Sequence, residues 1–229
     1  MLAVFDIGST LVVPSAARPA ARIAEALELD ESNGRELNRA LMTRMFSEQE
    51  MVVAFLSDAL GVASHRAMAA VAEVWSSQEQ EAQPVPGASE MLATLAESGV
   101  QLALLSNIWH PYLVSVRRYF GDTFDLYIPP SLQFFSYREG RMKPERELFG
   151  RLLETAGVPA DRAVMVGDSY LTDLQPAMEV GMKTVWVLAR PDHEVGNIID
   201  VINGTMMGPT HTTTAVTSLS LDLLDAVLE

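Results

Sequence analysis

Several polar residues stand directly after apolar stretches of this 229-residue sequence. Asp6 follows the first stretch and Ser106 the second, Asp168 and Asp173 follow the fourth, and Lys143 precedes an expected helix. Each has an ordinary explanation alone, as a helix cap or a surface charge. If the stretches are parallel strands, however, three carboxylates, a hydroxyl and an ammonium group converge on one crevice. Such a set could carry nucleophilic, acid–base or metal-assisted chemistry.

The elements that must position these residues are predicted by hydrophobic patterning. Short apolar or β-branched runs alternate with helix-like stretches, which predicts an α/β fold with a doubly wound parallel sheet and helices on both faces. The reactive crevice of such a sheet lies beyond the carboxyl ends of its strands. The expected strands are Leu2–Ile7, Val100–Leu105, Leu126–Ile128, Ala163–Val166, Thr184–Leu188 and a sixth near Thr214–Thr217. The expected core helices are Ala88–Glu97, Glu145–Ala156 and Leu219–Leu228, and residues 189–213 are expected to be irregular.

The segment between the first strand and its first core helix has a different character. Residues 14–84 contain no strand-like run, and apolar residues recur there with the 3.6-residue period of helices. We therefore predict an all-α cap at residues 14–84 inserted into a core of residues 1–13 and 85–229. A plain run of core helices is the alternative.

Composition excludes several function classes. Sixteen basic and thirty acidic residues give a net charge of −14, so nucleic acid and anionic membranes are poor partners. The absence of cysteine excludes disulfides and thiolate metal sites. No apolar stretch is long enough to span a bilayer, and the first residues lack the basic region of a signal peptide. We therefore expect a cytoplasmic protein.

Four motifs in this order resemble those of the haloacid dehalogenase (HAD) superfamily. They read VFDIGSTL at residues 4–11, LLSN at 104–107, MKP at 142–144 and GDSYLTD at 167–173. The resemblance covers residues 1–13 and about 85–190. It implies a Rossmann-like core and a Mg²⁺-dependent phosphatase that hydrolyses a small phosphorylated metabolite, and the inserted segment stands where the family carries a helical cap.

The resemblance also implies roles for the acidic residues. Asp6 would be the nucleophile that forms an aspartyl-phosphate. Asp6, Asp168 and the backbone carbonyl of Gly8 would ligate Mg²⁺, which prefers hard oxygen ligands. Asp173 would bind the ion through water or hold its ligands in place.

The remaining motif residues would bind the transferring group. By the same resemblance, Lys143 would neutralise the nucleophile and the phosphoryl oxygens. Ser106 and Asn107 would donate hydrogen bonds to the phosphoryl group, and Thr10 would tie the loop that follows Asp6.

One position departs from the family pattern. Family phosphatases usually carry a second aspartate two residues after the nucleophile, which acts as general acid and base, whereas this chain has Gly8. Proton transfer to the leaving group, typically worth about 10²–10⁴-fold in rate, would be lost. Ser9 is a poor replacement acid. His110 is a candidate because its ordinary pKa suits neutral proton transfer, although a packing role is favoured.

Other activities remain as alternatives. A non-catalytic or very weakly active HAD-like protein that binds a ligand or partner is the main one, and Gly8 is its support. A 2-haloacid dehalogenase attacks carbon without a metal, and the pair Asp168 and Asp173 argues against it. A phosphonate hydrolase needs a cap lysine, and residues 14–84 contain none.

Overall fold

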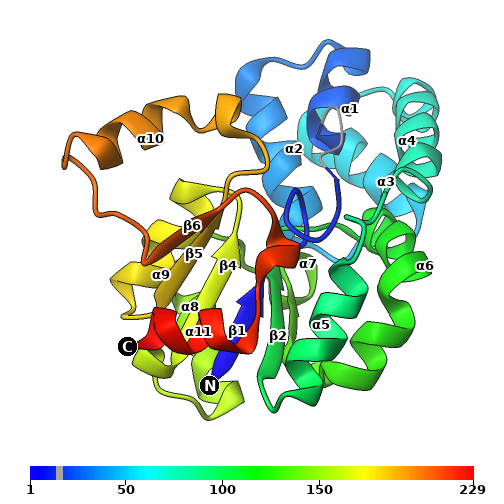
Figure 1. The fold of residues 1–229 in the computed structure, drawn as a ribbon. Helices are drawn as coiled ribbons and strands as arrows, with labels where there is room; N and C mark the ends of the chain where they lie inside the picture. The colour runs from blue at the N-terminus through cyan, green and yellow to red at the C-terminus, as the bar shows by residue number, and fades with distance from the viewer. Residues whose placement is uncertain (14–17) are drawn as a thin grey trace.

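The computed structural model describes residues 1–13 and 18–229, and its centre is a parallel sheet (Figure 1). Six strands lie in the order β3-β2-β1-β4-β5-β6, and every neighbouring pair is parallel. The strands are β1 (Leu2–Phe5), β2 (Gln101–Ser106), β3 (Gln133–Phe135), β4 (Ala163–Gly167), β5 (Lys183–Val187) and β6 (His211–Thr213). The doubly wound α/β prediction is therefore confirmed.

Helices cover both faces of this sheet. α5 (Ala88–Glu97) and α11 (Leu221–Leu228) lie over one face, whereas α8 (Arg146–Ala156) and α9 (Gln175–Glu179) lie over the other (Figure 1). The long α6 (His110–Tyr127) packs against α5. Burial on both faces explains why the central strands β1 and β4 are apolar throughout and fully buried.

Four helices follow β1 and gather beyond the carboxyl ends of the strands (Figure 1). They are α1 (Pro19–Leu27), α2 (Glu31–Thr43), α3 (Gln49–Leu60) and α4 (Ser64–Gln78). Their apolar faces form a hydrophobic cluster distinct from that of the sheet, and Trp109 of the sheet region joins it. We call residues 19–78 the helical segment. The predicted start of the cap, at residues 14–17, lies outside the described residues, and the domain boundaries stay a prediction.

Two strand predictions were wrong in position. Leu126 and Tyr127 belong to the end of α6 and Ile128 caps that helix, while the edge strand β3 comes five residues later. The sixth strand is His211–Thr213 rather than Thr214–Thr217, part of which forms a 3-10 turn. Short runs at sheet edges carry too few residues for hydrophobic period to separate strand from helix.

Residues 189–213 are more ordered than expected. They contain α10 (Val195–Ile202) and end in β6, and α10 projects from the sheet (Figure 1). Tyr170 packs beneath this region against Trp186, and its hydroxyl donates a hydrogen bond to the carbonyl of Met207. Across residues 1–13 and 18–229, no helix has both the length and the hydropathy needed to cross a membrane.

Candidate active site

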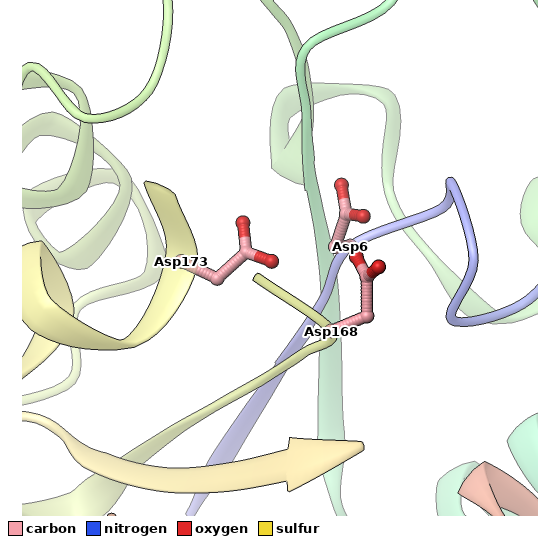
Figure 2. A group of neighbouring side chains, drawn as sticks. All are labelled: Asp6, Asp168 and Asp173. Carbon is pink, nitrogen blue, oxygen red and sulfur yellow. The ribbon is translucent and has the colours of Figure 1, made fainter. Parts of the chain in front are cut away.

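Three carboxylates meet at the carboxyl edge of the sheet. Phe5 of β1 pairs with Val166 of β4, so Asp6 and Asp168 emerge from adjacent strand ends. Asp173 reaches the same point from the turn after β4, and the three side chains face a shared space in Figure 2. One oxygen of each lies within 4.8 Å of the others, and all three residues are buried. Such a cluster of hard oxygen ligands suits a divalent cation.

Lys143 is the internal counter-ion of this cluster. Its Nζ donates to Asp6 Oδ1 at 2.7 Å and to Asp173 Oδ1 at 2.6 Å, and the residue is 2% exposed. Burial by itself would lower the pKa of Lys143, but Asp173 and Asp6 together raise that pKa above its ordinary value. Lys143 is therefore a fixed positive charge beside the candidate nucleophile.

Asn107 positions Lys143 through its backbone. The Asn107 Oδ1 accepts from the Lys143 N–H at 2.8 Å, and its Nδ2 donates to the Lys143 carbonyl at 2.9 Å. These contacts engage the amide that was expected to reach the phosphoryl group. Ser106, the last residue of β2, is buried at the same sheet edge, two positions beyond Leu104, the last β2 residue that pairs with β1.

The loop after Asp6 turns sharply. Ser9 has a φ of 60°, a left-handed conformation that glycine adopts at lower cost. The Leu11 and Val12 N–H groups both donate to the Ile7 carbonyl and close the turn. Thr10 is 1% exposed, and its Oγ1 is buried without a hydrogen-bond partner among the described residues. A buried hydroxyl without a partner indicates a place where an additional polar group would be stabilising.

The turn that carries Asp173 requires a glycine beside it. Tyr170–Leu174 form a π-helical turn, and Asp173 Oδ2 accepts from the Ser169 N–H at 3.1 Å. A Cβ on Gly167 would lie 2.7 Å from the Asp173 Cβ and Cγ, so no larger residue fits. Burial, together with Asp6 and Asp168, raises the pKa of Asp173 although Lys143 opposes the shift. The negative charges of this site are thus only partly compensated.

Asp168 has a cationic partner that sequence reasoning missed. Arg190, three residues after β5, donates from Nη2 to Asp168 Oδ2 at 2.7 Å. Trp186 Nε1 donates to the Asp168 backbone carbonyl at 3.0 Å. Burial and Asp6 raise the pKa of Asp168, whereas Arg190 and Lys143 lower it. No motif surrounds Arg190, so only its position after a strand end could have drawn attention to it.

His110 and Tyr112 lie where the helical segment meets the sheet region. The His110 ring centroid is 6.2 Å from that of Trp75 and 6.1 Å from that of Tyr137. Burial, and secondly Arg138, lower the pKa of His110, which keeps the imidazole neutral at neutral pH and makes it a poor proton donor. Tyr112 packs against both hydrophobic clusters.

Comparison with known proteins identifies the family. A family model for haloacid dehalogenase-like hydrolases matches residues 1–181, and the chain belongs to this family. The fold agrees: a crystal structure of a HAD hydrolase, family IA, variant 3, from Entamoeba histolytica superposes with a TM-score of 0.65. That superposition covers 100% of this chain and 99% of the other at 11% identity, so it bears on the fold alone.

Two curated relatives are similar over part of the chain. A glyceraldehyde 3-phosphate phosphatase from Pyrococcus abyssi is 36% identical over 107 residues, 44% of this chain and 41% of the relative. A ribulose-1,5-bisphosphate 5-phosphatase from Halopiger xanaduensis is 33% identical over 113 residues, 48% of this chain and 45% of the relative. The match thus spans less than half the length of these relatives.

Proposed function

We propose that this chain is a Mg²⁺-dependent phosphatase that hydrolyses a small phosphorylated metabolite through an aspartyl-phosphate at Asp6. The observation that carries the proposal is the Lys143 ammonium group held between Asp6 and Asp173, with Asp168 completing a cluster of three buried carboxylates. A nucleophilic carboxylate can approach a phosphate dianion only where positive charge offsets their repulsion. Lys143 and Arg190 together cannot balance the charge of three carboxylates and a dianion.

The residues present fit a divalent cation. Asp6 and Asp168 would hold it together with the Gly8 carbonyl, and Asp173 would act through Lys143 and the Ser169 N–H that it already contacts. The donor set is all oxygen and buried, as a hard divalent cation requires. When bound, Mg²⁺ would neutralise charge on the phosphoryl oxygens and on the nucleophile.

Each side chain of the site would then have its own role in the reaction. A carboxylate oxygen of Asp6 attacks phosphorus, and the bond to the ester oxygen breaks as that oxygen leaves with the electron pair. Lys143 stabilises the charge on Asp6 and on the phosphoryl oxygens, and Ser106 donates a hydrogen bond to the phosphoryl group. Water then hydrolyses the aspartyl-phosphate, which releases inorganic phosphate and regenerates Asp6. Asn107 keeps Lys143 in place.

The similar proteins support phosphorylated sugars as the substrate class. Both curated relatives are named as phosphatases, one of a three-carbon and one of a five-carbon phosphate compound. We propose a substrate of that size and charge. The helical segment, whose cluster includes Trp109 just beyond β2, would exclude water from the site.

Gly8 favours a second candidate, a HAD-like protein that binds its ligand with little or no turnover. A Cβ at residue 8 would have only Asp6 Oδ2 within 4 Å, at 3.9 Å, so the space that an acid would use is open. A phosphatase with Gly8 would need a good leaving group or a proton from the substrate. We therefore expect slow turnover of alkyl phosphates and faster turnover of phosphates with acidic leaving groups.

A phosphate-release screen separates these candidates. The purified chain is assayed with Mg²⁺ against three- to six-carbon sugar phosphates and an aryl phosphate, beside Asp6→Asn, which removes the nucleophile but keeps the side-chain shape. Activity that disappears in Asp6→Asn and with a chelator supports the phosphatase. Activity that persists in Asp6→Asn refutes Asp6 as nucleophile, and binding of phosphate without hydrolysis on any substrate favours the second candidate.

A further inference from the structure

The Arg190 guanidinium makes one hydrogen bond to Asp168, although its geometry allows two parallel ones. Its Nη2 donates to Asp168 Oδ2 at 2.7 Å, but Nε is buried without an acceptor among the described residues. Guanidinium groups usually bind carboxylates through two parallel hydrogen bonds. The Asp168 side chain is 8% exposed, whereas that of Arg190 is 32% exposed, so the arginine is the partner nearer to solvent.

The charges of the site give this contact a consequence. Asp6, Asp168 and Asp173 bring three negative charges, and Lys143 and Arg190 bring two positive ones. A fixed cation on Asp168 repels any divalent ion that uses the same carboxylate. The same cation attracts the phosphate dianion of the substrate. Three carboxylates, one lysine and a divalent ion have a net charge of zero, so Arg190 would supply the positive charge that favours phosphate binding.

We propose that Arg190 sets the balance between metal and phosphate affinity at this site, weakening the binding of the divalent cation and strengthening that of the phosphate dianion. This inference rests on the proposed function and adds to it a residue outside the four motifs. Arg190 acts through Asp168 and is a positioning and charge-balancing residue.

The test is calorimetric and uses two ligands. Mg²⁺ is titrated into the full chain, and inorganic phosphate is titrated into the chain with saturating Mg²⁺. In Arg190→Gln, we expect the Mg²⁺ dissociation constant to fall and the phosphate dissociation constant to rise, each by about 3- to 30-fold at low salt. Arg190→Met removes the same charge with a long side chain and should behave alike, whereas Arg190→Lys should stay near wild type for Mg²⁺.

Opposite shifts distinguish this role from a structural one. If Arg190 merely orders the loop, its removal would raise the dissociation constants of both Mg²⁺ and phosphate. If the Arg190–Asp168 pair is an inert surface pair, neither constant would change. Either result overturns the inference. Arg117→Gln is the matched control, since Arg117 is 33% exposed and pairs with Asp125 outside the site. If the wild-type chain binds no Mg²⁺, the proposed function fails too. If it binds Mg²⁺ and phosphate normally while Arg190→Gln leaves both constants unchanged, this inference alone fails.

Discussion

The Asn107 side-chain amide makes two hydrogen bonds to the backbone of Lys143, to its N–H at 2.8 Å and to its carbonyl at 2.9 Å. This pairing resembles that between two backbone segments, and it links residues 36 positions apart. The lysine that compensates the charge of Asp6 and Asp173 therefore depends on the residue that follows β2. This link joins two of the four motifs into one unit.

Asn107→Ala is expected to lower kcat/KM by about 10- to 100-fold, because Lys143 loses both contacts that fix its backbone. Phosphate release measured at several substrate concentrations tests this. Asn33→Ala is the control, since Asn33 contacts Asp30 within the exposed start of α2. An Asn107→Ala enzyme as active as Asn33→Ala would contradict the positioning role.

Lys143→Met should destabilise the metal-free fold by about 3–5 kcal/mol, because buried carboxylates would lose their internal cation. Urea unfolding in the presence of a chelator measures the change. Added Mg²⁺ should recover part of the loss and stabilise the variant more than wild type. The only other lysine, Lys183, supplies the control Lys183→Met, which should cost far less. Equal stability of Lys143→Met and wild type would show that the cluster does not need Lys143.

Gly167→Ala should displace Asp173, since the added methyl group would overlap the Asp173 side chain. We expect a loss of several kcal/mol in unfolding free energy or a clear loss of Mg²⁺ affinity, measured by urea unfolding and calorimetry. Gly150→Ala in α8 is the matched change, because a Cβ there meets nothing within 4 Å and should stabilise the helix by about 0.5–1 kcal/mol. Similar effects of the two changes would argue against a tight contact at Gly167.

Gly8→Asp should restore a proton donor to the leaving group. The position has room for a side chain, and kcat on alkyl phosphates should rise by about 10²-fold or more. Gly8→Asn has nearly the same shape without an acidic proton and should show no such gain. If both variants have equal rates, proton transfer is not what limits the natural chain.

His110 predicts a pH dependence of stability. Because the pKa of His110 is lower in the fold than in the unfolded chain, its protonation favours unfolding. The stability due to the neutral imidazole is present above the unfolded pKa of about 6.5 and is lost as the pH falls through the folded pKa. Urea unfolding from pH 7.5 to 5 should therefore show a steeper loss for wild type than for His110→Gln. His65→Gln, on the exposed side of α4, should follow wild type.

Much of the fold and most of the cluster could be predicted from sequence because parallel strands place the residues after them at one edge. Asp6, Asp168 and Asp173 followed from that rule, and Lys143 was expected beside them from the order of the four motifs. The structure brings all four together. The strand prediction at Leu126–Ile128 failed although a helical signal was present: Phe120, Phe124 and Ile128 recur every four residues and are all fully buried. The prediction gave more weight to the short apolar run at Leu126–Ile128 than to the helical spacing of the buried residues before it.

The contacts of Asn107 and Arg190 could not be predicted. Each joins residues more than twenty positions apart through a side chain whose orientation depends on tertiary packing. Residue type alone indicates that an amide or guanidinium group can donate hydrogen bonds, but not which acceptor it will meet.

The indole of Trp109 packs edge-on against Trp75, 5.5 Å between ring centroids, and donates from Nε1 to Gln78 Oε1 at 2.8 Å. One of the largest side chains in the interior of α1–α4 is therefore supplied by the chain just beyond β2. Excised from the rest of the molecule, those four helices would lose one indole from their hydrophobic cluster, and Gln78 Oε1 would lose its buried donor. The hydrophobic core of the inserted helices is consequently complete only when the segment that carries Ser106 and Asn107 contributes Trp109 to it.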